Sequence, residues 1–274
     1  MSSHIQIDTI HNISKDIRIK LLHMIYNAKS GHTGGSLSCV DILATLYFRI
    51  LRYDSAHPDD PNRDRFILSK GHSVEAYYAT LAEAGFLSDE ELHSYGVFNT
   101  RLFGHPTIKI PGIEAASGAL GHGLSIGLGM AIAAMRDNRE SRVYVLMGDG
   151  EQAEGSIWEA AMAASHYHVS NLVAIIDNNK LQISGNVDDV MRISCLKKRW
   201  SAFGWNVIEV DGNNIQELIK TFEELQRNQE EPTLIIAHTI KGKGVSFMEN
   251  NPAWHHKVPT EEELKTAISE LESV

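Results

Sequence analysis

The residues best suited to chemistry sit where two short apolar segments end. Asp149 comes just after Val143–Met147, and Asn179 comes soon after Leu172–Ile176. Nearly continuous apolar segments of this length are typical of parallel strands that are buried on both faces. Ligands of such sheets gather beyond the carboxyl ends of the strands. We therefore expect Asp149 and Asn179 to face each other across two neighbouring strand ends.

Three oxygen atoms at these ends are of the kind that a hard cation prefers. Besides the Asp149 carboxylate, the Asn179 amide oxygen and the Leu181 backbone carbonyl, Mg²⁺ would need two phosphate oxygens and a water to complete its octahedron. The glycines that flank Asp149 let a diphosphate approach the backbone, and a helix expected from Gly155 adds its positive dipole end. Gly-Asp-Gly also occurs in ordinary turns. Two asparagines after a second buried strand favour a metal–diphosphate site, with Ca²⁺ as the alternative metal.

Four of the fourteen histidines lie in turns flanked by glycine or proline: His32, His72, His105 and His255. Imidazole suits proton transfer near physiological pH and hydrogen bonds to a diphosphate or to sugar hydroxyls. Any one of them could simply cap a turn or fill a crevice. Because the diphosphate motif is present, we interpret the set as functional. His93, His166 and His168 lie on helical segments and are interpreted as surface or core residues.

The elements that must position these residues alternate along the chain and predict an α/β fold. We expect a mostly parallel sheet with helices on both faces. The expected strands are Asp64–Leu68, Val143–Met147, Leu172–Ile176, Trp205–Val210 and Thr233–Thr239. The expected helices are an opening helix that ends by Gly31, one through Leu51, a short one capped by Ser88, and Val74–Ala84, Ser117–Met135, Gly155–His168, Ile215–Gln226 and Glu261–Leu271.

Three local features refine this pattern. Ser30–Ser36 is predicted to be a glycine-rich loop, and Ser38 with Asp41 resembles a capping box that begins the helix through Leu51. Ser117–Met135 has almost no polar face, so we expect it to be buried on all sides, with a subunit interface supplying the close packing.

Length and composition fit one large domain. The chain has 274 residues, of which 43% are hydrophobic, and a net charge of −10, which argues against nucleic acid as a partner. An anionic substrate would therefore have to be held by local cations. No apolar segment is long enough to span a membrane, and the start lacks a signal-peptide core, so we expect a cytoplasmic protein. Cys39 and Cys195 are interpreted as free thiols.

The segment Gly148–Ala160 reads Gly-Asp-Gly-x-x-x-Glu-Gly-x-x-x-Glu-Ala. Together with the downstream asparagines, it resembles the thiamine-diphosphate signature, in the form found in the amino-terminal half of transketolases. The resemblance covers essentially the whole chain. It implies that residues 1–274 form a single domain that binds the diphosphate of thiamine diphosphate together with Mg²⁺.

The resemblance also implies roles for the four turn histidines. His32 and His105 match family residues near the hydroxyls of the donor sugar, and His32 is also a candidate for proton transfer. His72 and His255 match residues that contact the diphosphate and the reacting carbon. The family usually has Trp-His-Gly where this chain has Trp-His-His, so His256 stiffens the loop and leaves the placement of His255 open.

Other site residues follow from the resemblance alone. The implied cofactor-binding residues are His72, Gly118, Ala119, Leu120, Gly148, Asp149, Gly150, Glu151, Asn179 and His255. The stretch from Gly118 to Leu120 could equally be a tight turn before a buried helix. Glu154 and Glu159 match two glutamates of the family's dimer interface, where shared protons couple the active sites; for Glu159 the alternative is a solvated position. Lys241 or Lys243 could meet a phosphate, although solvated loop lysines are more usual.

The resemblance covers only half of a transketolase. In the family, the glutamate that activates the cofactor and the groups that hold the substrate phosphate come from a pyrimidine-binding domain of the other protomer. The resemblance matches neither that domain nor the C-terminal domain to any of the 274 residues, so we expect a split transketolase in which a separate C-terminal subunit completes an α2β2 assembly. A truncated chain is the alternative. Such an enzyme transfers a two-carbon ketol unit from a ketose phosphate to an aldose phosphate.

Other functions stay open at this point. The chain could belong to another thiamine-diphosphate enzyme, such as a deoxyxylulose-phosphate-type synthase or a subunit that decarboxylates 2-oxo acids. It could also be a cofactor-binding module without catalysis. A nucleotide-binding Rossmann domain is the weakest alternative, because no Gly-x-Gly-x-x-Gly follows the first strand. Whether the sugars are pentose phosphates or branched-chain relatives is not decided by the sequence.

Overall fold

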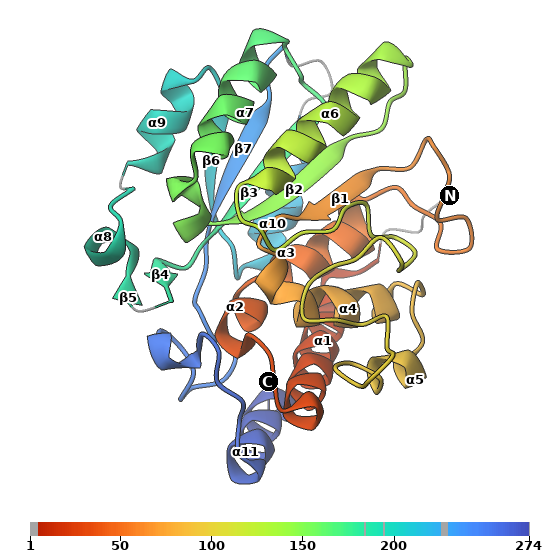
Figure 1. Cartoon of the computed structure of the whole chain (residues 1–274), viewed down its shortest axis with the longest axis vertical. Coiled ribbons are helices and arrows are strands. Elements are labelled where there is room, and N and C mark those ends of the chain that lie inside the picture. Colours follow the sequence, from red (N-terminus) through yellow and green to blue (C-terminus); the bar gives the residue numbers. More distant parts are fainter. Residues whose placement is uncertain (1–4, 184, 194, 226–229, 274) are drawn as a thin grey trace.

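A five-stranded parallel sheet forms the centre of the computed structural model (Figure 1), which describes residues 5–183, 185–193, 195–225 and 230–273. The strand order is β1-β2-β3-β7-β6, and each neighbouring pair is parallel. The five predicted strands are confirmed with small shifts at their ends. Their bounds are β1 Arg65–Leu68, β2 Val143–Gly148, β3 Leu172–Asn178, β6 Asn206–Asp211 and β7 Thr233–His238.

Helices cover both faces of the sheet, which confirms the predicted fold class. Successive strand residues point to opposite faces, so Tyr144 and Leu146 join one hydrophobic core while Val145 and Met147 join the other. The first core includes residues of α1 (Ile7–Ala28), α3 (Val40–Thr45), α4 (Val74–Glu83) and α10 (Ile215–Glu223). The second core includes residues of α6 (His122–Arg136), α7 (Gly155–His166) and α9 (Leu196–Ala202).

Shorter elements surround the carboxyl ends of the strands. The 3₁₀ turns η2 (Gly71–Ser73) and η3 (Gly150–Ala153) follow β1 and β2, and a small hairpin of β4 (Leu181–Gln182) and β5 (Gly185–Asn186) follows β3. The remaining elements are α2 (Thr33–Ser38), η1 (Leu46–Ile50), α5 (Asp89–Leu92), α8 (Val187–Val190), η4 (Pro252–Trp254) and α11 (Glu261–Glu272). The hairpin, α8 and α9 were not anticipated from the sequence. Figure 1 shows α11 beside α1.

Three predictions about the first hundred residues are wrong, wholly or in part. The expected loop Ser30–Ser36 becomes helical at Thr33, where α2 begins. The expected capping box is absent, because the Ser38 hydroxyl donates to the Asp177 carboxylate at 2.5 Å and Asp41 pairs with Arg18 at 2.7 Å. The side chains of Ser38 and Asp41 thus bind buried residues that are distant in the sequence, and they are not available to cap the helix. The helix expected through Leu51 instead ends as the π-helical turn η1.

Helix α6 begins five residues later than predicted. Gly118 and Gly121 have φ angles of 137° and 87°, in the region that favours glycine, so the chain turns before the helix can start. One side of α6 packs on the sheet, but Ile126 and Met135 on another side are exposed. Burial on all sides is therefore not achieved within one chain, and the subunit interface that would complete it stays a prediction.

Both cysteines and one helix cap agree with the sequence predictions. Cys39 is buried and Cys195 is exposed, and both are free thiols as predicted. Ser88 forms the predicted capping box with Glu91 at the start of α5. The helix expected to Gln226 ends at Glu223, and residue 226 lies outside the described residues. Among the described residues, no helix combines the length and the apolar character needed to cross a bilayer.

The packing of α6 on the sheet can be tested with two glycines of the same helix. A Cβ atom at Gly127 would lie 2.5 Å from Cγ2 of Val145, whereas one at Gly129 would meet nothing within 4 Å. We predict that Gly127→Ala lowers the free energy of unfolding by about 1–3 kcal/mol through overpacking. Gly129→Ala should raise it by about 0.5–1 kcal/mol through helix propensity. Urea denaturation of the isolated chain measures both free energies of unfolding. Equal effects of the two substitutions would contradict the described packing of α6 on the sheet.

Candidate active site

The ends of β2 and β3 meet directly, as the two apolar segments led us to expect. Gly148 pairs with Asp177 in the parallel register. The Asp149 carboxylate then accepts a hydrogen bond from the backbone N–H of Lys180 at 2.5 Å and another from Gly150 at 2.7 Å. The turn after β2 is therefore tied to the turn after β3, and Asp149 and Asn179 lie on the same side of the fold.

Asp149 is a buried carboxylate whose hydrogen bonds come from backbone N–H groups. Its residue is only 4% exposed, and among the described residues no lysine or arginine forms an ion pair with it. Burial and the nearby charge of Asp177 raise the pKa of Asp149 to about 6. Burying a carboxylate without a paired charge is costly. A cation beside Asp149 would remove that cost.

The two other proposed cation ligands follow β3 directly. The Asn179 amide oxygen accepts the Leu181 N–H at 3.1 Å, and its amide nitrogen donates to the Ser38 hydroxyl at 3.4 Å. The Leu181 carbonyl accepts from the Lys241 ammonium at 3.4 Å. Within the described ranges, no three His, Cys, Asp or Glu side chains are grouped for a metal. One carboxylate, one amide oxygen and one carbonyl instead fit a hard cation such as Mg²⁺.

A buried ion pair next to this site was missed by the sequence analysis. The Lys70 ammonium donates to the Asp177 carboxylate and, at 3.0 Å, to the Gly35 carbonyl. Asp177 also accepts from the hydroxyls of Ser38 and Thr239. Burial lowers the pKa of Lys70, but the Asp177 charge outweighs it and the pKa is raised overall. The signal in the sequence was Asp177, directly after a buried apolar segment, because a buried aspartate needs a positively charged or hydrogen-bonding partner.

Glu151 has a structural role, because its side chain connects three segments of the chain. Its buried carboxylate accepts from the Ser69 hydroxyl, from the Gly121 N–H at 2.8 Å and from the Gly148 N–H at 3.0 Å. It therefore joins the loops that follow β1, precede α6 and follow β2. The Gly148 N–H is thereby occupied within the chain. A direct contact of Glu151 with the cofactor stays a prediction.

The three other predicted histidines gather around His32. Its ring centroid lies 5.4 Å from that of His72, 5.5 Å from His255 and 6.3 Å from His105. His256 is nearer still, at 4.6 Å. These residues come from the start of α2, the turn η2, the loop after α5 and the end of η4. Segments more than two hundred residues apart thus build one imidazole cluster.

The cluster is kept neutral by its surroundings. Burial, followed by the charge of His256, lowers the pKa of His32 to about 3. Burial and Lys241 lower the pKa of His255 to about 4, and burial lowers that of His72 well below its usual value. Neutral imidazoles can both donate and accept hydrogen bonds. Sugar hydroxyls require partners of this kind.

Lys241 is the lysine that contacts the cluster. Its ammonium lies 3.0 Å from Nδ1 of His255, and burial together with Lys70 lowers its pKa to about 8. Lys243, the other lysine considered, forms an ion pair with Glu249 at 3.5 Å. The structure therefore favours Lys241 as the lysine that could meet a phosphate.

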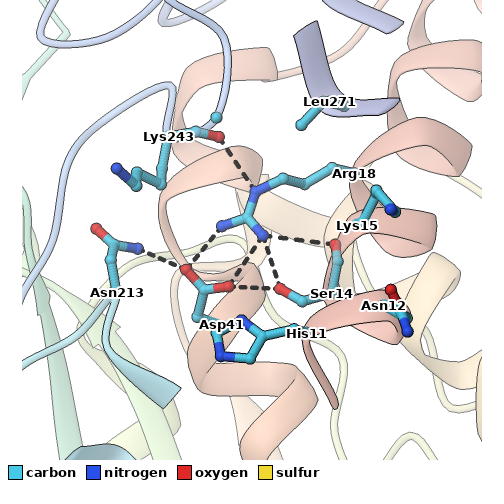
Figure 2. A pocket seen from close by; sticks show the side chains of 10 residues that line it. His11, Asn12, Ser14, Lys15, Arg18, Asp41, Asn213, Lys243 and Leu271 are labelled. Atoms are coloured by element: carbon cyan, nitrogen blue, oxygen red, sulfur yellow. Dashed lines mark hydrogen bonds and ion pairs between the residues drawn. The ribbon is translucent and has the colours of Figure 1, made fainter. Parts of the chain in front are cut away.

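A second cluster, of buried and half-buried polar residues, holds the segment that carries Lys241 at Ile240 and Lys243, and Figure 2 shows its members Arg18, Asp41 and Asn213. Arg18 donates to both carboxylate oxygens of Asp41 and, through Nε–H, to the Lys243 carbonyl at 3.2 Å. Asn213 donates to Asp41 at 2.9 Å and accepts from the N–H of Ile240 at 2.9 Å. This cluster lines a cavity of about 260 Å³, and the sequence analysis did not identify it.

The remaining predicted residues lie around the cluster or on the surface. A Cβ atom at Gly118 would come within 2.5 Å of the His105 ring, so this glycine lets the segment from Gly118 to Leu120 approach the cluster. That segment is also the tight turn before α6, and Ala119 at its centre is exposed, between the half-buried Gly118 and Leu120. Glu154 and Glu159 are both exposed in the single chain, so an interface around them stays a prediction.

Known proteins resemble this chain along nearly its full length. Residues 9–271 match the family described as transketolase, thiamine diphosphate binding domain. The chain is 51% identical to one of the subunits of the apulose-4-phosphate transketolase of Phocaeicola vulgatus, covering 97% of this chain and 95% of that protein. It is 42% identical to a 6-deoxy-6-sulfo-D-fructose transketolase subunit of Clostridium sp., covering 97% of each.

Single-chain transketolases resemble it over less than half of their own length. The transketolase of Homo sapiens is 39% identical over 98% of this chain, which spans 43% of the human protein. The crystal structure of transketolase from Campylobacter jejuni superposes with a TM-score of 0.92 at 29% identity, covering 98% of this chain and 43% of that one.

The low pKa of His32 predicts a pH effect on stability. Between about pH 6.5 and pH 3 the unfolded chain binds a proton at His32 that the folded chain does not, so stability falls as the pH falls. His32→Gln, which cannot bind that proton, should lose less free energy of unfolding than the wild type between pH 7 and pH 5. Urea denaturation at both pH values measures this, with His168→Gln as an exposed control. Identical pH slopes for His32→Gln and the wild type would refute the neutral, buried imidazole.

Proposed function

Because the chain belongs to the transketolase family and corresponds to its thiamine-diphosphate-binding domain, we propose that it is the cofactor-binding subunit of a two-component transketolase. The observation that carries this proposal is the pattern of coverage. The chain spans 95% and 97% of two relatives named as transketolase subunits, but 43% of the single-chain human enzyme. A second subunit would supply the pyrimidine-binding half.

We propose that thiamine diphosphate binds with Mg²⁺ at the joined ends of β2 and β3. Asp149, Asn179 and the Leu181 carbonyl would hold the cation, and Ca²⁺ is the alternative metal. The buried, unpaired Asp149 carboxylate supports this assignment, because it is the charge that a cation would balance. When bound, thiamine diphosphate supplies the electron sink that allows a carbon–carbon bond of a ketose to break.

The chain's own residues would position the sugar and take part in proton transfer. The neutral His32 would accept a hydrogen bond from a sugar hydroxyl, as the residue proposed for proton transfer, with His105 donating or accepting a second hydrogen bond. His255 is oriented by its contact with Lys241, and Lys241 supplies positive charge for a phosphate. Local cations of this kind are needed because the protein as a whole carries a net charge of −10.

The proposed reaction is the transfer of a two-carbon ketol unit from a ketose phosphate to an aldose phosphate. The relatives described above are transketolases, which favours ketol transfer over a deoxyxylulose-phosphate-type synthesis or a cofactor-binding module without catalysis. The 51% identity to a protein named for apulose 4-phosphate favours a branched-chain ketose phosphate over those of the pentose phosphate pathway. Ketose phosphates of both kinds belong in the first assays.

We further propose an α2β2 assembly in the cytoplasm. The exposed apolar residues Ile126, Met135 and Met162 of α6 and α7 support a contact between two copies of this chain. Glu154 and Glu159 would be buried by that contact. The two free cysteines suit a reducing compartment.

Dependence on a partner gives the first test of this function. The purified chain alone should show little or no ketol transfer to an aldose phosphate, whether the donor is a branched-chain ketose phosphate or D-xylulose 5-phosphate. Adding the C-terminal transketolase subunit from the same genome should produce the activity with at least one of these donors, measured by the appearance of the ketose phosphate that is two carbons longer than the acceptor. Robust transfer by the chain alone would overturn the two-subunit proposal.

Removing the unpaired carboxylate gives the second test. Asp149→Ala should weaken thiamine diphosphate binding by the assembled complex more than about tenfold in the presence of Mg²⁺, because a ligand of the cation is lost. Isothermal titration calorimetry measures the affinity. The chain should still fold, since the substitution removes a buried charge that the described chain does not pair. Asp59→Ala, at an exposed carboxylate, is the matched control, and equal affinities for the two variants would contradict the proposed site.

A further inference from the structure

We propose that His256 contacts the substrate, hydrogen-bonding a hydroxyl of the sugar phosphate at the solvent side of the histidine cluster. This inference rests on the proposed ketol-transfer function and deepens it by naming a residue that distinguishes hydroxylated sugar donors from shorter ones.

The position of the His256 ring carries the inference. Its centroid is 4.6 Å from that of His32, nearer than any of the three other imidazoles around His32, with the two rings at 73° to each other. His32 is half-buried and His256 is exposed. A molecule that reaches His32 from solvent would therefore pass beside the His256 ring.

The backbone around His256 is held in place, although its ring is exposed. The Thr33 hydroxyl donates to the Lys257 carbonyl at 2.6 Å. The Lys257 ammonium lies 4.0 Å from the centre of the Trp254 ring and 2.7 Å from the Glu263 carboxylate. Trp254 is buried and lies against Phe247. Because the residues on both sides of His256 are held in this way, its backbone loses little conformational freedom when the ring binds a ligand.

The chemistry of the free ring nitrogens points to hydroxyl groups. In the part of the chain that the structure describes, no hydrogen bond engages the ring nitrogens of His32, His105 or His256. Each imidazole has two ring nitrogens that can take part in hydrogen bonds, so a row of neighbouring imidazoles matches the successive hydroxyls of an open-chain sugar. The positive charge that a phosphate would require lies elsewhere, at Lys241 beside His255. His256 therefore suits a hydroxyl better than a phosphate.

Two donors that differ in their hydroxyls provide the test. D-Xylulose 5-phosphate carries hydroxyls beyond the two transferred carbons, whereas hydroxypyruvate carries none and releases carbon dioxide when its ketol unit is transferred. In the reconstituted complex, His256→Gly should raise KM for D-xylulose 5-phosphate about three- to tenfold, the effect of one hydrogen bond. KM for hydroxypyruvate and the Kd of thiamine diphosphate should stay within about twofold of wild type, an effect of about 0.4 kcal/mol or less.

Matched variants separate a contact from a loosened loop. His256→Asn keeps a donor and an acceptor, so it should restore part of the affinity for D-xylulose 5-phosphate. His168→Gly changes an exposed histidine with a φ of 50° that precedes β3, at the other end of the strands, and should leave both donors unaffected. Equal KM changes for both donors in His256→Gly, or no change for either, would overturn the proposal.

A binding measurement keeps this inference separate from the proposed function. In complex assembled with ¹³C-histidine-labelled chain, the imidazole resonances of His256 should shift on titration with D-xylulose 5-phosphate and not with inorganic phosphate. If the wild-type complex transferred no ketol unit from these two donors or from a branched-chain ketose phosphate, the proposed function would fail, and this titration would still decide the role of His256. An unchanged His256 resonance at saturating sugar phosphate would overturn it.

Discussion

A buried negative charge without a partner is the constraint on which this site depends. Two aspartates lie at the ends of adjacent strands, and the chain treats them differently. Asp177 receives the Lys70 ammonium and two hydroxyls, so its charge is balanced inside the protein. Asp149 receives only backbone N–H groups among the described residues, and its pKa rises to about 6. A divalent cation bound by Asp149 and Asn179 would complete the arrangement, and the turns around it are already tied together by hydrogen bonds.

The same pairing of buried polar groups shapes the histidine cluster. Glu75, which is fully buried, accepts hydrogen bonds from the His32 N–H at 3.1 Å, the Ser36 hydroxyl at 2.8 Å and the Tyr95 hydroxyl at 2.7 Å. The backbone of His32 is thereby fixed, while the ring nitrogens stay open to a ligand. Burial keeps the imidazoles neutral, which suits hydroxyl groups, and Lys241 supplies the positive charge beside them. Rigid backbone and free side-chain nitrogens together make a preorganised site.

Much of this could be predicted from the sequence, because local patterns determine it. Apolar segments of strand length predicted that Asp149 and Asn179 lie at neighbouring strand ends of a parallel sheet, and turns flanked by glycine or proline led us to interpret the four histidines as functional. The ion pairs of Lys70 with Asp177 and of Arg18 with Asp41 were missed, since their members are 107 and 23 residues apart and no local period connects them. For the same reason a local cap was wrongly assigned where tertiary contacts take the side chains. The apolar composition of α6 predicted burial on all sides, but composition does not show which side a single chain leaves exposed.

The central claim is that a cation binds between the ends of β2 and β3. Anomalous diffraction from crystals of the reconstituted complex grown with thiamine diphosphate and Mn²⁺ in place of Mg²⁺ tests it most directly. The account predicts one strong anomalous peak within about 2.0–2.4 Å of a carboxylate oxygen of Asp149, the amide oxygen of Asn179 and the carbonyl oxygen of Leu181. A cofactor bound elsewhere, or a peak that none of these three oxygens contacts, would contradict it.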